Sequence, residues 1–246
     1  MISAIRALLQ FTTVLPLGKT APFIDFARNS WLYPLAGYVT GGIAAGVLYL
    51  LSALSLPPLI QAVIAVGVII LVSGANHLDG LFDLGDGLMA HGSREKRIHA
   101  LTDRQIGTGG TALGLMVTLL AIVSLGSCTP GYIAASALIL AETGAKWGMA
   151  SLTILGKPFH EGLHESLHKE AKLWFFIPAT LLILPACLLP LSPEALAGAA
   201  CSVVAVPLVT CIVAQNLFGG VNGDVTGATG EISRAVILAV VVSIMA

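Results

Sequence analysis

Seven apolar segments, each about as long as a membrane-spanning helix, dominate this chain of 246 residues. A helix that crosses the bilayer needs roughly 20 apolar residues. With 56% hydrophobic and only 10% charged residues, the chain has too little polar surface for a water-soluble domain of this size. We therefore expect an all-α, polytopic integral membrane protein, with about seven transmembrane helices in one bundle and a single domain over 1–246. The expected spans are 31–52, 57–77, 109–127, 131–155, 172–190, 195–218 and 231–246.

Positively charged residues lie on one side of these spans. Lys and Arg precede the first span and occupy the long connections 79–108 and 156–171, whereas the short connections near 55–58, 128–131 and 191–193 contain none. Cytoplasmic loops carry an excess of Lys and Arg. We therefore expect the N-terminus and the long connections in the cytoplasm and the C-terminus outside. The net charge of −1 predicts no nucleic-acid partner.

Three aspartates follow the second span directly, in HLDGLFDLGDG (77–87). Asp79, Asp83 and Asp86 have the spacing i, i+4, i+7, which places them on one face of a helix. Like charges on one face repel, and carboxylates near a membrane resist leaving water. A divalent cation would compensate, and ligands that are all oxygen favour Mg²⁺ or Mn²⁺. The alternative is a solvated loop that caps a helix, but three aspartates interleaved with glycines favour the metal site.

A basic segment and a fourth acidic residue follow. Asp103 precedes the glycine-rich start of the third span, 107–110, where backbone amides could receive a phosphate. Arg94, Arg97 and Arg104 are candidate phosphate contacts beside a metal. The alternative is that these arginines only follow the cytoplasmic excess of positive charge.

Two polar positions lie within or beside the spans. Glu142 and Lys146, one helical turn apart in the fourth expected span, can partly neutralise each other, and their cost in lipid favours a functional interior position. His77 is either a residue of the substrate site or an interface residue.

Two further segments carry charged residues. GGVNGDVTGATGE (219–231) is expected to be a glycine-rich turn on the side of the aspartates, with Asp224 and Glu231 near a ligand. The connection after the fourth span has histidines at a spacing of four that could bind a soft metal. The flanking acidic residues favour a solvated amphipathic segment instead. These histidines are His160, His164 and His168.

The segment 77–110 resembles the signature region of cobalamin synthase, also called adenosylcobinamide-GDP ribazoletransferase, with the pattern H-x-D-G-x-x-D-x-x-D-G and then D-x-x-I-G-x-x-G. Residues 219–231 are similar to the late G-G-x-x-G-D-x-x-G-A segment of that family, and FTTVLPLG with YPLAGYVTGGIAAG is similar to its N-terminal part. Lys146 stands where relatives carry Arg, and a lysine lacks the two-donor phosphate contact of an arginine. The signature matches at His77, Asp79, Gly80, Asp83, Asp86, Gly87, Asp103, Ile106, Gly107 and Gly110.

The resemblance implies the last assembly of the cobalamin nucleotide loop. In that reaction α-ribazole, or its 5′-phosphate, attacks the cobinamide-side phosphorus of adenosylcobinamide-GDP and releases GMP. It implies small-molecule substrates, a lipid environment in a bacterial or archaeal cytoplasmic (inner) membrane, and a site facing the cytoplasm. The number of copies in the assembly stays open. The metal ligands would be Asp79, Asp83 and Asp86, with Asp103 as a fourth ligand or as the base. The substrate contacts would be His77, Arg94, Arg97, Arg104, Lys146, Asp224 and Glu231.

Two other classes of protein deserve comparison. CDP-alcohol phosphotransferases also carry an aspartate cluster and release a nucleotide, but their pattern D-G-x-x-A-R followed by G-x-x-x-D-x-x-x-D does not occur here. Ion-coupled transporters place binding groups near the bilayer midplane in corresponding halves. Here the acidic residues gather at one edge and no repeat is visible, so both alternatives are disfavoured.

Overall fold

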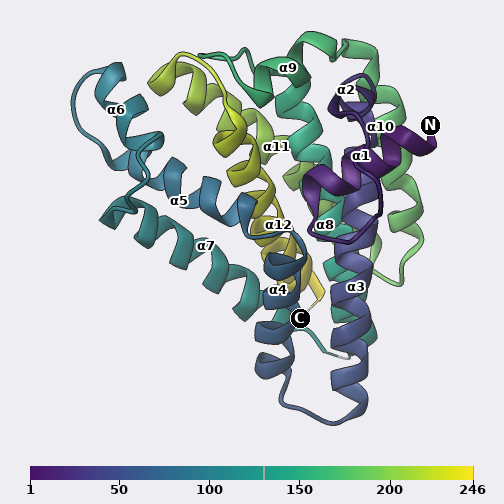
Figure 1. Cartoon of the computed structure of the whole chain (residues 1–246). Helices are drawn as coiled ribbons and strands as arrows, with labels where there is room; N and C mark the ends of the chain where they lie inside the picture. The colour runs from purple at the N-terminus through teal and green to yellow at the C-terminus, as the bar shows by residue number, and fades with distance from the viewer. Residues whose placement is uncertain (130, 246) are drawn as a thin grey trace.

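The computed structural model describes residues 1–129 and 131–245, and this part of the chain is helical without a β-strand (Figure 1). Pro130, in an expected turn, and Ala246, at the end of the last expected span, lie outside the described residues. The helices are α1 (Ile2–Thr12), α2 (Phe23–Ala27), η1 (Ser30–Leu32), α3 (Tyr33–Ala53), α4 (Pro58–Val72), α5 (Asn76–Met89), α6 (Arg94–Leu101), α7 (Thr108–Gly126), α8 (Gly131–Leu155), α9 (Leu163–Glu170), η2 (Leu173–Phe175), α10 (Phe176–Ile183), η3 (Leu184–Leu188), α11 (Pro193–Phe218) and α12 (Gly223–Met245).

Four helical segments are long and apolar enough to cross a membrane: Ser30–Ala53, α7, α11 and α12. Two bent pairs, α4 with α5 and α9 with Leu173–Leu188, raise the number to six if each pair is one span. The expectation of an all-α polytopic membrane protein is thus confirmed, whereas the expected count of seven is not. The remaining expected span is α8, which has 25 residues but carries Glu142 and Lys146 and is not among the apolar candidates.

The second expected span is shorter than the hydropathy suggests. It ends at Val72, and α5 continues at an angle of 95° to α4. The turn between them contains Gly74 and Ala75 with φ of +66° and +59°. A helix cannot continue through two successive left-handed residues, so the chain bends here. Charged side chains resist the bilayer interior, which favours the membrane edge for the polar helices α5 and α9.

The last span is longer than expected. Residues 223–230 were expected to be a loop, but α12 begins at Gly223, so that expectation is wrong. The glycines in this stretch permit close helix packing. A Cβ at Gly227 would lie 3.2 Å from the Cα of His77, and one at Gly230 would lie 3.0 Å from the sulfur of Met149. Small residues of this kind let membrane helices approach each other.

Helix α8 lies at the centre of the bundle and is buried along most of its length. It runs beside α3 (Figure 1). Gly37 and Gly41 of α3 face Glu142 of α8, where a Cβ at Gly37 would lie 2.6 Å from the Glu142 carbonyl oxygen. Close packing of α3, α8 and α12 therefore brings the polar residues of the interior together.

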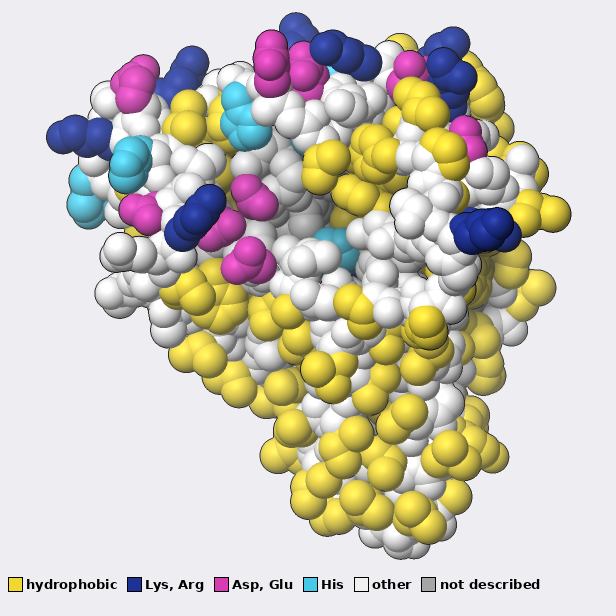
Figure 2. All heavy atoms as spheres, in the orientation of Figure 1, with side chains coloured by type: hydrophobic (Ala, Val, Ile, Leu, Met, Phe, Trp, Pro, Cys, Tyr) yellow, Lys and Arg dark blue, Asp and Glu magenta, His cyan; other side chains and the backbone are white. Residues whose placement is uncertain are grey.

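Charged side chains gather at one end of the face seen in Figure 2, and the opposite end is covered by hydrophobic side chains. The first end includes α6, α9 and the start of α12, and α5 runs from the middle of the molecule toward α6 (Figure 1). This distribution places the candidate site at the polar end of the bundle.

Candidate functional site

The three aspartates of the signature lie on one short helix. Asp79 is exposed on α5, while Asp83 and Asp86 are half-buried. The expected i, i+4, i+7 arrangement on a helical face is therefore present, although 79–89 was expected to be part of a long connection. The break at Gly74 and Ala75 sets the direction of this helix.

The start of α12 brings a fourth carboxylate to this cluster. A Cβ at Gly80 would lie 2.6 Å from the carbonyl oxygen of Asp224, so only a glycine allows this approach. Burial and then, in decreasing order, the neighbouring Asp224, Asp79 and Asp86 carboxylates together raise the pKa of the Asp83 carboxyl to about 7. The expectation that the late glycine-rich segment lies beside the aspartates agrees with this packing.

Asp86 binds the start of the next helix. Its Oδ2 accepts a hydrogen bond from the amide of Gly107 at 2.7 Å, and its Oδ1 accepts one from the amide of Gly110 at 2.8 Å. The first amides of a helix have no partner within the helix, and a carboxylate also complements the positive end of the helix dipole. The side chain of α5 thus acts as a cap for α7. The spacing of the aspartates gave no sign of this role.

The oxygen-only donors of this cluster suit a hard divalent cation such as Mg²⁺ or Mn²⁺. Among the described residues, no group of three or more His, Cys, Asp or Glu side chains is arranged to hold a metal ion. Mg²⁺ commonly binds one or two carboxylates together with substrate phosphates and water. The cluster therefore fits a cation that arrives with a phosphate substrate better than a resident ion in a complete cage.

The basic segment surrounds the outer end of α5. Arg97 donates hydrogen bonds to the carbonyl oxygens of Gly87 at 3.3 Å and Leu88 at 2.9 Å, so it caps the end of α5. Arg94 is exposed and lies against Gly219. Arg104 is also exposed.

Asp103 lies in the turn between α6 and α7, away from the regular helices. It is exposed, its Oδ1 accepts a hydrogen bond from the amide of Gln105 at 3.1 Å, and its Oδ2 is 4.0 Å from His99 Nδ1. Its side chain is 42% exposed. Asp103 is thus freer to engage a ligand than Asp86.

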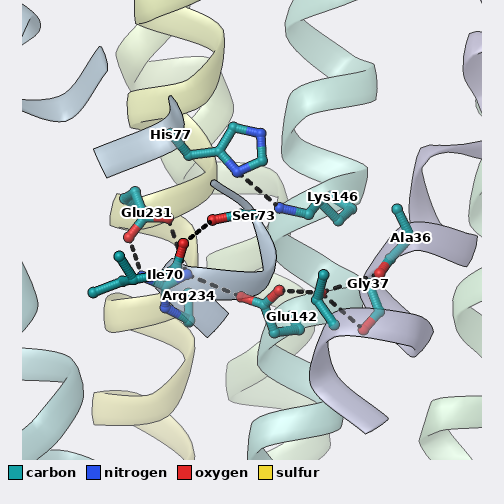
Figure 3. Close-up of polar contacts among 10 residues, drawn as sticks. Ala36, Gly37, Ile70, Ser73, His77, Glu142, Lys146, Glu231 and Arg234 are labelled. Carbon is teal, nitrogen blue, oxygen red and sulfur yellow. Dashed lines mark hydrogen bonds and ion pairs between the residues drawn. The ribbon is translucent and has the colours of Figure 1, made fainter. Parts of the chain in front are cut away.

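A buried polar network lies deeper in the bundle (Figure 3). Lys146 Nζ is 3.2 Å from His77 Nδ1, and Arg234 Nη1 is 3.0 Å from both Glu142 Oε1 and Glu231 Oε1. Arg234 Nη2 also contacts Glu231. Glu142 and Lys146 were expected to neutralise each other in part, and the guanidinium of Arg234 pairs with Glu142 directly.

Two features of this network were missed from the sequence. Arg234 is not among the expected site residues, and its side chain is buried within α12. Glu231 was expected in a loop beside a ligand, but it is buried in α12 and engaged by Arg234. The i, i+3 spacing of Glu231 and Arg234 in an apolar segment was the available signal. Thr40 completes the network by donating a hydrogen bond of 2.6 Å to Glu142 Oε2.

A cavity of about 310 Å³ lies between the carboxylate cluster and this network. Figure 2 shows a hollow on this face, with acidic side chains along one edge and a histidine at its bottom. Contrary to the expectation of a solvated segment, His164 of α9 is buried and lines the cavity. The lining residues are Phe11, Tyr33, Asn76, His77, Met149, Leu163, His164, Leu167, Gly223, Asp224 and Thr226.

Fold and site together define a multi-pass helical membrane protein with a carboxylate-rich site at its polar end. The family described as cobalamin-5-phosphate synthase matches residues 4–242, and the chain belongs to this family of transferases of cobalamin biosynthesis.

Curated relatives cover nearly the whole chain, and each is named adenosylcobinamide-GDP ribazoletransferase. The protein of Halorubrum lacusprofundi is 35% identical over 97% of this chain and 96% of its own length. The protein of Deinococcus radiodurans is 35% identical over 96% of this chain and 84% of its own length. The protein of Pyrococcus furiosus is 33% identical over 95% of this chain and 96% of its own length. No solved structure matches the chain.

Proposed function

We propose that this chain transfers the cobinamide phosphate group of adenosylcobinamide-GDP to α-ribazole or its 5′-phosphate and releases GMP. The observation that carries the proposal is the convergence of Asp79, Asp83 and Asp224 from two helices beside a cavity. The relatives named adenosylcobinamide-GDP ribazoletransferase support the same substrates. The site would bind one activated phosphate and one alcohol.

In this reaction a ribose hydroxyl of the acceptor attacks the phosphorus on the cobinamide side of the diphosphate. The new P–O bond forms as the phosphoanhydride bond breaks, and GMP leaves with the electron pair of that bond. Asp79, Asp83 and Asp224 would hold Mg²⁺ or Mn²⁺ with the diphosphate, and Asp86 would position α5 against α7. When bound, the cation would neutralise the charge that develops on the leaving nucleotide.

The remaining roles concern the proton and the phosphate oxygens. Asp103, exposed between α6 and α7, would accept the proton of the attacking hydroxyl or serve as a fourth ligand. Arg94 and Arg104 are exposed and would contact the phosphate oxygens. The buried His77 and Lys146 lie on the cavity side of the site. Glu231 would act by holding Arg234.

The test uses the full chain purified into lipid nanodiscs, with adenosylcobinamide-GDP and either acceptor. Mass spectrometry should detect adenosylcobalamin, or its 5′-phosphate, together with one equivalent of GMP, and EDTA should stop the reaction until Mg²⁺ is restored. Release of CMP from a CDP-activated lipid alcohol, without turnover of the cobinamide substrate, would favour the phosphotransferase alternative.

We also propose that the site faces the cytoplasm of a bacterial or archaeal cell. The Lys and Arg residues of the expected long connections and the charged end of the face in Figure 2 support this orientation. The C-terminus would then lie outside the cytoplasm. Alkaline phosphatase fused after residue 246 should be active, and green fluorescent protein fused at the same place should not fluoresce. The reverse pattern would overturn the orientation.

A further inference from the structure

The cavity of about 310 Å³ beside Asp224 has a lining that differs from the carboxylate cluster. We propose that this cavity binds the aromatic base of the acceptor, and that His77 donates a hydrogen bond from Nε2 to the ring nitrogen of the base that is not bonded to ribose. The proposal rests on the proposed transferase function and adds to it the position of one substrate and the group that recognises its base.

The walls of the cavity suit a flat apolar ring. Phe11, Tyr33, Met149, Leu163 and Leu167 supply aromatic, thioether and branched aliphatic surface. Its volume is at the lower end of the roughly 300–1,000 Å³ typical of small-molecule sites, which are mostly apolar with a few polar groups. Aromatic rings and methionine sulfur pack favourably against a flat ligand ring.

The same lining does not suit a phosphate group. No Lys or Arg is among the described residues that line the cavity. A phosphate or diphosphate that entered it would lose water without gaining a cation, and this is costly. The phosphate groups of the substrates therefore stay outside the cavity, beside the carboxylates that would hold the cation.

The tautomer of His77 follows from its neighbour. Lys146 Nζ lies 3.2 Å from His77 Nδ1 (Figure 3). An ammonium group only donates hydrogen bonds, so Nδ1 accepts and the ring proton is on Nε2. In Figure 3 the second ring nitrogen of His77 points away from Lys146. No hydrogen bond within the described part of the chain uses this nitrogen, so His77 can donate to a ligand.

The cavity also sets the orientation of the acceptor. Asp224 lines it, and the backbone of Asp224 contacts Gly80, which lies between Asp79 and Asp83 in the chain. A base with its free nitrogen at His77 has its ribose on the opposite side of the ring, toward Asp224. The attacking hydroxyl would thus reach the edge of the carboxylate cluster while the base stays in the apolar cavity.

The first experiment pairs a change in the protein with a change in the ligand. Calorimetry with the full chain in nanodiscs would measure binding of α-ribazole and of an analogue in which the free ring nitrogen is a C–H group. We expect the unchanged protein to prefer α-ribazole by about tenfold or more, the effect of one buried hydrogen bond. His77→Leu should remove the preference, whereas His91→Leu, in an exposed loop, should keep it. If His77→Leu prefers α-ribazole over the analogue as strongly as the unchanged protein does, the proposal is overturned.

A second variant keeps the proposal testable if His77→Leu does not fold. Leu163 lines the cavity but is 59% exposed, so Leu163→Trp should fold while it fills part of the cavity. We expect it to weaken α-ribazole binding and raise the KM for the acceptor about tenfold or more, with the KM for adenosylcobinamide-GDP unchanged. Leu173→Trp, at a leucine that is 71% exposed and outside the cavity, is the matched control.

The outcomes separate the two proposals. If the unchanged protein forms no product from adenosylcobinamide-GDP, the proposed function fails. If it forms product but Leu163→Trp binds α-ribazole normally, only the assignment of the cavity fails.

Discussion

Gly80 of α5 lies against the backbone of Asp224 of α12, and a Cβ at this glycine would be 2.6 Å from the Asp224 carbonyl oxygen. This contact joins the two helices that supply the carboxylates. The lack of a side chain at Gly80 therefore allows the short distance between the acidic residues of α5 and Asp224.

Gly80→Ala should push α5 and α12 apart. Overpacking of this kind costs about 1–3 kcal/mol, and the displaced carboxylates should reduce turnover at least tenfold. Thermal unfolding in detergent and the GMP-release assay would measure both effects. Gly42→Ala is the control, because a Cβ there meets nothing within 4 Å. Normal activity and stability of Gly80→Ala would contradict the close approach.

Asp83→Asn should separate activity from stability. Asp83 is half-buried among Asp79, Asp86 and Asp224, and this burial and crowding raise its pKa. A neutral amide removes repulsion, so the melting temperature should stay the same or rise. Loss of one ligand to the cation should reduce turnover by about a hundredfold or more. Full turnover of Asp83→Asn over a range of Mg²⁺ concentrations would refute its role.

Asp86→Ala should behave differently, because the side chain caps α7. The amides of Gly107 and Gly110 would lose their acceptor. Loss of a helix cap costs about 0.5–2 kcal/mol, so the melting temperature should fall. Asp86→Asn retains one carbonyl acceptor and should lose less. Equal stability of the Ala and Asn variants would argue against capping.

Removal of Arg234 should be among the most damaging changes. Its guanidinium compensates Glu142 and Glu231, and all three side chains are buried. Leaving buried charges unpaired costs roughly 3–5 kcal/mol, so Arg234→Met should unfold far more readily in detergent. The exposed pair of Arg28 and Glu170 provides the comparison. Arg28→Met should cost under about 1 kcal/mol.

Acid should destabilise the protein through His164. The pKa of His164 falls from 6.5 to about 4, mainly because the imidazole is buried; the hydrogen bond to the Gly156 carbonyl opposes this shift, and the nearby His168 and His160 add to it. The unfolded chain therefore binds more protons between pH 6.5 and 4. Stability should fall as the pH decreases through this window, by up to about 3 kcal/mol, and then level off.

The measurement is denaturant unfolding at several pH values. His164→Gln should flatten the slope between pH 6.5 and 4, whereas His91→Gln, at an exposed position, should preserve it. An unchanged slope in His164→Gln would assign the effect to other groups.

The sequence predicts the bounds of three spans closely because hydropathy is a local property. The ends of α3, α7 and α11 lie within two residues of the expected bounds. The break at Gly74 and Ala75 has no comparable signal, since it depends on two backbone torsions. The start of α12 was missed because glycines that serve close helix packing resemble the glycines of a turn.

The candidate site was partly predictable for the same reason. The spacing of Asp79 and Asp83 fixes their common face, and this needs no tertiary information. The partner of Glu142 could not be found locally, because Arg234 is 92 positions away in the chain. Likewise, the spacing of Asp86 says nothing about the amides of α7.

The hydrogen bonds of Asp86 connect the carboxylate cluster to α7. The first turn of α7, a helix long enough to cross the membrane, is tethered by a side chain that belongs to the acidic face of α5. A cation that recruited both oxygens of Asp86 would have to take them from those amides. Binding of a cation by Asp86 would therefore change the position of α7 in the membrane.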